Sequence, residues 1–89
     1  MSLAVSPSPF RAGGAFRLTL ERRGELAVEV LDAVGRRVRQ VFHGELPAGT
    51  STLRWDGRDA LGAPQPAGVY FVRVWADGGQ LAKTVVLLR

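Results

Sequence analysis

The feature that most constrains the fold of this chain is a period of two in its hydrophobic pattern. Phe16, Leu18 and Leu20 alternate with polar residues, which is the spacing of a strand with one buried face. The segments with a similar strand pattern are residues 26–30, 38–42, 53–55 and 70–75, and residues 84–88 are apolar almost throughout. Every window long enough for a helix meets glycine, proline or a β-branched residue within about two turns. The periodicity therefore predicts an all-β chain.

Turn-forming clusters of glycine, proline and aspartate separate these segments. They lie at residues 13–14, 32–35, 47–49, 56–68 and 77–79. Asp77-Gly78, between two apolar runs, is the strongest hairpin signal in the chain. About seven strands with turns roughly every 8–12 residues predict a small antiparallel β-sandwich of immunoglobulin-like type.

The length of the chain predicts one domain, residues 1–89, with a single core. Because the sequence has no cysteine, that core must hold by packing, and disulfide, thiolate and zinc-ribbon chemistry are excluded. No run of 18 apolar residues is present, so we expect no membrane insertion. Pro7, Pro9 and Arg11 interrupt the place of an apolar signal-peptide core. If the domain is exported, we expect the export signal elsewhere on a longer parent chain.

Residues 56–68 form the longest segment without a strand pattern, and their glycines and prolines predict a defined crossover between two sheets. Asp56 and Asp59 lie three residues apart in this segment, and such carboxylates are calcium ligands in other proteins. Their spacing does not fit an EF-hand loop. The alternative is that both carboxylates accept backbone N–H groups and fix the turn. We favour the turn, keep the two residues as metal candidates, and expect no cofactor.

Catalytic chemistry has little support in the sequence. His43 is the single histidine, it lies at the end of a predicted strand, and no serine sits in a Gly-x-Ser-x-Gly elbow. The acidic residues are scattered over turns rather than paired around a cleft. The sequence therefore predicts a protein that is not an enzyme.

The basic balance of the chain, a formal net charge of +4, raises the question of nucleic-acid binding. Arg36, Arg37 and Arg39 form the tightest basic cluster, but glutamates nearby in the sequence dilute it. Arginines on an edge strand also discourage sheet-to-sheet pairing. We expect no nucleic-acid partner, and a contact between this cluster and a partner protein stays open.

The aromatic residues divide between two faces of the predicted strands. Trp55 and Tyr70 fall on the inward phase of the alternation and are predicted to lie in the core. Phe71, Arg73 and Trp75 fall on the opposite face. Three interpretations stay open for that face: packing under neighbouring side chains, a docking surface for a protein, and a platform for carbohydrate.

Several motifs together resemble a known family. Residues 31–38 are similar to its DxxGRxV turn, residues 46–59 to its lpaGxxxxxWdGxD strand and loop, and residues 66–70 to its paGxY strand entry. With the start at residues 6–10 and the ending at residues 83–89, the chain resembles the FlgD-type immunoglobulin-like domain of the flagellar hook-capping protein. It is also similar to the related type A C-terminal sorting domain of type IX secretion cargo. The motifs cover nearly the whole chain in the right order.

The resemblance implies a non-catalytic C-terminal module that sorts or anchors a larger secreted bacterial protein at the cell surface. Its partners would be the parent polypeptide and the type IX secretion and attachment machinery. The signal-bearing residues that the resemblance implies are Lys83, Val85, Val86, Leu87, Leu88 and Arg89. We expect this segment to form a strand with one edge open to a partner.

Two alternatives from other classes stay open. One is an accessory module that binds carbohydrate or protein through Phe71 and Trp75. The other is a structural spacer or assembly domain like that of the hook-capping protein.

Overall fold

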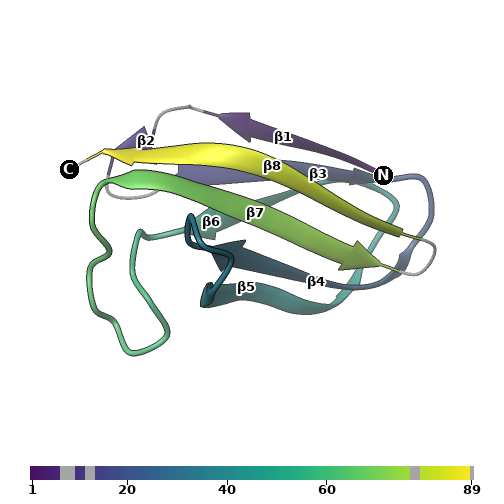
Figure 1. Cartoon of the computed structure of the whole chain (residues 1–89). Helices are drawn as coiled ribbons and strands as arrows, with labels where there is room; N and C mark the ends of the chain where they lie inside the picture. The colour runs from purple at the N-terminus through teal and green to yellow at the C-terminus, as the bar shows by residue number, and fades with distance from the viewer. Residues whose placement is uncertain (7–9, 12–13, 77–78, 89) are drawn as a thin grey trace.

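Two β-sheets packed face to face make up the computed structural model, which describes residues 1–6, 10–11, 14–76 and 79–88 (Figure 1). The strands are β1 (Ser2–Ser6), β2 (Phe10–Arg11), β3 (Gly14–Leu20), β4 (Gly24–Leu31), β5 (Arg37–Leu46), β6 (Gly49–Trp55), β7 (Gly68–Ala76) and β8 (Gly79–Leu88). The described residues contain no helix, so none of them forms a helix that could cross a membrane.

The sheet topology is that of an immunoglobulin-like sandwich. One sheet has three strands in the order β1-β3-β6, and the other has five in the order β2-β8-β7-β4-β5. All strand pairs are antiparallel except β2 with β8, which is parallel. Successive strands β1 and β2 therefore belong to different sheets. The predicted all-β sandwich of about seven strands is confirmed. The described residues form seven strands of five residues or more, together with β2, which is only two residues long.

The core lies between the sheets and is built from the inward phase of the alternation. The most deeply buried side chains are Phe16, Leu18, Val28, Val30, Trp55, Val72, Val74, Val85 and Leu87. Trp55 is 1% exposed and meets Tyr70 edge to face, with ring centroids 5.2 Å apart. Trp55 and Tyr70 are thus core residues, as the sequence predicts, and aromatic packing helps to join the two sheets without a disulfide.

Residues 56–68 carry the chain from β6 in one sheet to β7 in the other, which confirms the predicted crossover. The Trp55 indole donates its N–H to the Arg58 carbonyl (2.9 Å) at the start of the loop. At its end, the Tyr70 hydroxyl donates to the Pro66 carbonyl (2.6 Å), four residues upstream. This bond has the form of the tyrosine corner found at the same point of immunoglobulin-like sandwiches. Both core aromatics therefore also fix the loop.

The predicted hairpin turn at Asp77-Gly78 lies outside the described residues, as do Gly13 and Arg89. The strands on either side of that turn, β7 and β8, pair in antiparallel with Ala76 opposite Gly79.

Candidate recognition surfaces

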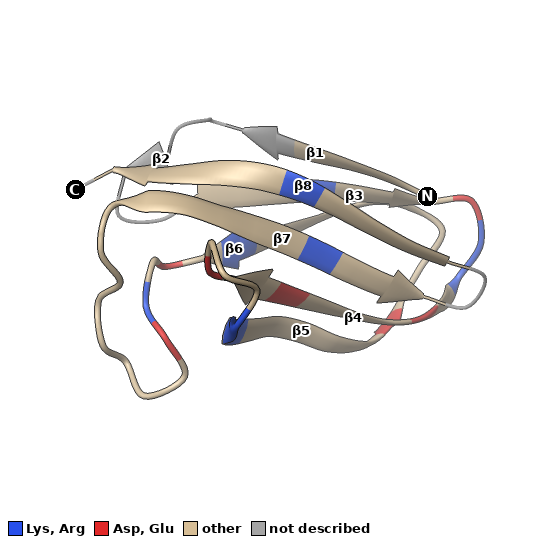
Figure 2. Ribbon diagram, viewed as in Figure 1, with Lys and Arg blue, Asp and Glu red and all other residues tan. Residues whose placement is uncertain are grey.

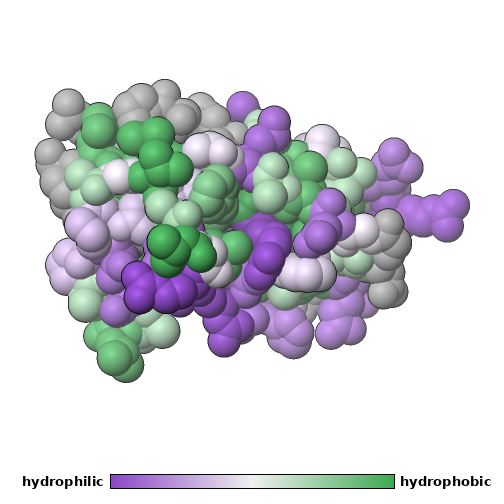
Figure 3. Space-filling view, in the orientation of Figure 1, coloured by the Kyte–Doolittle hydropathy of each residue, from purple (hydrophilic) through white to green (hydrophobic). Residues whose placement is uncertain are grey.

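The outer face of the five-stranded sheet carries the aromatic residues that the sequence placed away from the core. Val69, Phe71, Arg73 and Trp75 alternate with the buried residues of β7. Val69 and Trp75 are both exposed, and Phe71 is half-buried. Figure 3 shows hydrophobic side chains gathered on this face over the start of β7 and the end of β8. This face is therefore where the exposed apolar side chains Val69, Trp75 and Val86 lie.

A buried ion pair divides this face. Glu29 on β4 is 9% exposed and lies directly opposite Arg73 on β7 in the antiparallel register. Figure 2 shows the basic position on β7 beside the acidic position on β4. Glu29 Oε1 accepts bonds from Arg73 Nε (3.1 Å) and from a terminal guanidinium nitrogen (2.8 Å), while Glu29 Oε2 lies 3.7 Å from Arg37.

The same carboxylate also holds Trp75. The indole N–H donates to Glu29 Oε1 (3.2 Å), and the Arg73 guanidinium carbon lies 4.7 Å from the centroid of the indole ring. Burial raises the pKa of Glu29. The hydrogen bonds from Arg73 and Trp75 and the charges of Arg73 and Arg37 lower it, so that the pKa of Glu29 lies below its ordinary value. Glu29, Arg73 and Trp75 are one fixed cluster.

Phe71 shares the face but lies apart from this cluster. Its neighbours in the register are Leu31 and Thr84, and Arg73 stands between it and Trp75 along β7. The three residues predicted as one docking surface are therefore arranged as a Trp75–Arg73 unit and a separate half-buried Phe71. The sequence pattern does not distinguish Glu29, because its alternation with valines predicts only an outward side chain and does not indicate that Arg73 is its cross-strand neighbour.

The segment that the resemblance implies as a signal lies in β8, with its side chains divided between two sides. On the core side Val85 and Leu87 are fully buried and Lys83 is exposed, and on the outer side Val86 is 36% exposed and Leu88 is half-buried. The predicted strand is present, but its outer edge is open only in part. β2 pairs with Leu87 and Leu88, and among the described residues no strand pairs with that edge between residues 79 and 86.

Asp56 and Asp59 fix the crossover loop. Asp56 Oδ1 accepts the Arg58 backbone N–H (3.0 Å) and a bond from the Arg39 side chain (3.1 Å). Asp59 Oδ1 accepts the N–H groups of Leu61 and Ala63, both at 2.9 Å. The two carboxylates thus do what the turn interpretation predicts. Within the described ranges, no three acidic, histidine or cysteine side chains come together as a metal site.

Each arginine of the basic cluster meets a carboxylate. Arg36 pairs with Asp32, Arg39 with Asp56, and Arg37 lies near Glu29. The pKa of Asp32 lies below its usual value. The backbone N–H of Arg36 lowers it most, and the Arg36 side chain and the Val34 N–H lower it further, while desolvation acts in the opposite direction. These local pairings reduce the field that a nucleic acid would need. His43 is exposed on β5, with Ala27 as its cross-strand neighbour.

Comparisons with known proteins agree with this geometry. The family model described as the FlgD Ig-like domain matches residues 8–80. The basal-body rod modification protein FlgD of Salmonella typhimurium is 36% identical over 55 residues, which are 62% of this chain and 24% of that protein. The chain thus spans about a quarter of the length of the curated relatives that it matches.

Two solved structures from Porphyromonas gingivalis share the fold over almost the whole chain. One is PorZ, described as an essential bacterial surface component of the type IX secretion system (TM-score 0.69, 22% identity, 98% of this chain and 11% of that one). The other is dimeric latent PorU (TM-score 0.78, 23% identity, 97% of this chain and 9% of that one). At these identities the likeness is one of fold.

Proposed function

Because this chain belongs to the FlgD Ig-like domain family, we propose that it is a non-catalytic module that sorts or anchors a larger secreted bacterial protein. Residues 1–89 act as one folded unit that type IX secretion machinery recognises. The module contributes a surface and a strand, and the parent chain contributes any chemistry. Its place of action is the cell surface or the exterior.

The observation that carries the proposal is the arrangement of β8. Val85 and Leu87 anchor the strand in the core, so that Val86 and Leu88 are held in fixed positions on its outer side and Lys83 is held exposed on the other side of the sheet edge. A partner that reads this strand meets a preorganised surface and orders no loop on binding. The structural neighbours support the same direction, since PorZ is described as a surface component of the type IX system.

A fusion experiment tests the proposal. Residues 1–89 are fused to the C-terminus of a passenger that carries its own inner-membrane export signal, in a bacterium with a type IX system. We expect the passenger at the cell surface. The double variant Lys83→Ala with Arg89→Ala, and separately Val86→Ser, should leave the passenger in the periplasm. A matched control, Arg17→Ala with Arg54→Ala, removes two exposed charges from the other sheet and should not affect export.

Folding must be measured beside export. Exposed charges typically contribute less than about 1 kcal/mol, so the two charge variants should melt close to the wild-type domain. The melting temperature of Val86→Ser is measured in the same way. Export lost with folding intact supports recognition of β8. A wild-type fusion that stays in the periplasm contradicts the sorting function.

The identity to FlgD favours a second candidate, a structural domain in an extracellular assembly. The test is to replace the corresponding segment of the Salmonella protein with residues 1–89 and to measure swimming. Restored motility together with failed type IX export would favour the assembly function over sorting.

A further inference from the structure

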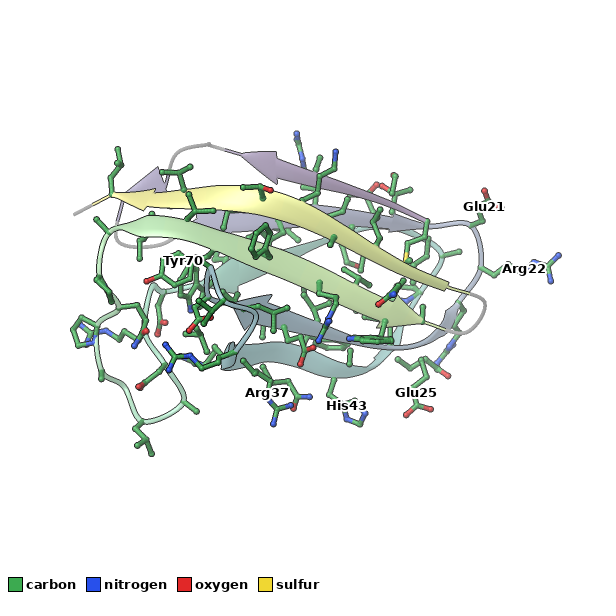
Figure 4. All side chains as sticks on the ribbon, viewed as in Figure 1. Glu21, Arg22, Glu25, Arg37, His43 and Tyr70 are labelled. Atoms are coloured by element: carbon green, nitrogen blue, oxygen red, sulfur yellow. The ribbon has the colours of Figure 1, made fainter. Side chains whose placement is uncertain are left out.

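A shallow depression lies on the outer face of the five-stranded sheet, beside the end of β7. Its lining residues are Glu25, Leu26, Ala27, His43, Trp75 and Ala76. The register places Ala27 between His43 on β5 and Trp75 on β7. Neighbouring strands lie about 4.8 Å apart, so the backbones that carry the two rings are roughly 10 Å apart, and the small Ala27 side chain lies between them. Figure 4 shows Glu25 and His43 projecting near one another at this end of the sheet.

The indole of Trp75 presents one face to this depression. Arg73 lies over one face of the ring. Trp75 lines the depression and Arg73 does not, which fits a depression that meets the opposite ring face. Trp75 as a whole is 45% exposed, and its indole N–H is bonded to Glu29. Because these contacts already fix the indole, a ligand that stacks on it does not have to order the side chain.

Two polar side chains border the open ring face. Among the described residues, the Glu25 carboxylate makes no ion pair or hydrogen bond, whereas the neighbouring Glu45 is paired with Arg23. His43 is exposed, and its imidazole offers both a donor and an acceptor. The depression thus combines an aromatic wall with unused hydrogen-bonding groups, which is the composition of a small-ligand site.

The charges around the depression select against an anionic ligand. The Arg73 guanidinium already occupies the cation–π position behind the indole, and it is itself paired with Glu29. The free Glu25 carboxylate disfavours an anion. A neutral ligand with one apolar face and several hydroxyl groups fits these conditions.

We propose that this depression binds a single pyranose ring of a neutral carbohydrate. The C–H face of the sugar stacks on the open face of Trp75, and its hydroxyl groups bond to Glu25 and His43. The site is shallow, so the dissociation constant is on the order of 1 mM. It does not involve β8, and it is independent of the proposed sorting function.

A titration followed by NMR tests the proposal. Methyl glycosides of glucose, galactose and mannose are added to residues 1–89, and the two tryptophan indole N–H signals are followed. Trp75 should shift in a saturable manner with at least one glycoside, while the buried Trp55 serves as an internal control. Trp75→Ala and Glu25→Ala should each weaken binding about tenfold or more. The matched control Phe71→Ala, on the same face beyond Arg73, should bind as the wild type does.

The outcomes separate this site from the sorting surface. If no glycoside up to about 50 mM, far above the expected dissociation constant, moves the Trp75 signal, the proposal is wrong. It is equally wrong if Trp75→Ala stays folded by circular dichroism and still binds, or if choline binds as well as the sugars. Fusions that carry Trp75→Ala should still be exported, because that variant leaves β8 unchanged.

Discussion

At the scale of single residues, the two tryptophans have opposite environments. Trp55 is buried under both sheets, whereas Trp75 stands on the outer face with nearly half of its surface exposed. The same residue type is therefore a core residue at one position and a surface residue at the other.

Trp55→Ala should lower the free energy of unfolding by about 3–5 kcal/mol, the range for emptying a core aromatic site. It also removes the indole bond to the Arg58 carbonyl and the edge contact with Tyr70. Trp75→Ala should cost much less, because its ring is only partly removed from water. Urea denaturation of both variants measures the difference, and equal losses would contradict the assigned facing.

Glu29 should make stability depend on acid pH. Its pKa is lowered in the folded protein, so its ion pairs stabilise the fold above its ordinary value of 4.5, and this contribution is lost as the pH falls through the folded-state value. Glu29→Gln should be less stable than the wild type at pH 7, and the gap should narrow below pH 4.5.

Denaturation curves of the wild type and Glu29→Gln between neutral and acid pH check this. Asp32 also has a lowered pKa, but it is present in both proteins and cancels in the comparison. A gap that stays constant through the acid range would show that the Glu29 charge contributes nothing.

At the scale of elements, the crossover loop between β6 and β7 is held by its own side chains. Asp59 accepts two backbone N–H groups, and Gly62, at a φ of 85°, lets the chain turn between them. The hydrogen bonds that fix this turn come from the loop's own side chains.

We expect a chelator to leave the melting temperature unchanged, because the loop carboxylates are occupied by N–H donors and too few oxygens remain for a six- to eight-coordinate calcium ion. Asp59→Ala should lower the melting temperature whether or not calcium is present. A chelator-induced drop that calcium reverses would identify a metal site instead.

The open edge of β8 has a charged residue that discourages pairing with a further strand. Lys83 lies opposite the buried Val72 in the register, so its stem is on the core side of β8 while the residue is exposed. A charge that points inward at a sheet edge discourages the addition of another strand.

Lys83→Val should therefore promote self-association through the β8 edge, seen as an earlier elution volume in size-exclusion chromatography. Lys83→Arg keeps the charge and should elute as the wild type does. If Lys83→Val behaves as the wild type at high concentration, the edge is protected by something other than Lys83.

At the scale of the whole molecule, the two outer faces differ in character. The three-stranded sheet shows an alanine, three threonines and two arginines to solvent, namely Ala4, Arg17, Thr19, Thr50, Thr52 and Arg54. The five-stranded sheet shows Val69, Trp75 and Val86. A partner that needs apolar contact is therefore more suited to the five-stranded sheet.

The sandwich is also closed by strands that lie far apart in the sequence. β2 pairs with the end of β8, and Leu87 enters the core at that point. Removal of residues 87–89 should therefore cost at least about 3 kcal/mol, the cost of an emptied leucine site and more. Removal of Arg89 alone should change thermal stability little.

Thermal melts followed by circular dichroism measure both truncations. A truncation at residue 86 that melts as the wild type does would contradict the role of Leu87 in closing the sandwich. If the truncated domain unfolds as expected, a loss of export in the truncated fusion is explained by unfolding. That loss then says nothing about whether residues 87–89 are a sorting signal.

The sequence by itself determined the strands β3 to β8, the turns at residues 32–35 and 47–49, the crossover at 56–68 and the inward facing of Trp55 and Tyr70, because a period of two and the turn residues are local properties of the chain. It also carried the motifs of the family. The tertiary structure alone decided which side chains meet across strands. The cluster of Glu29, Arg73 and Trp75 joins β4 to β7, and the covered end of β8 depends on β2. Such neighbours follow from strand order and register, which are set by contacts between distant segments and leave no local pattern to read.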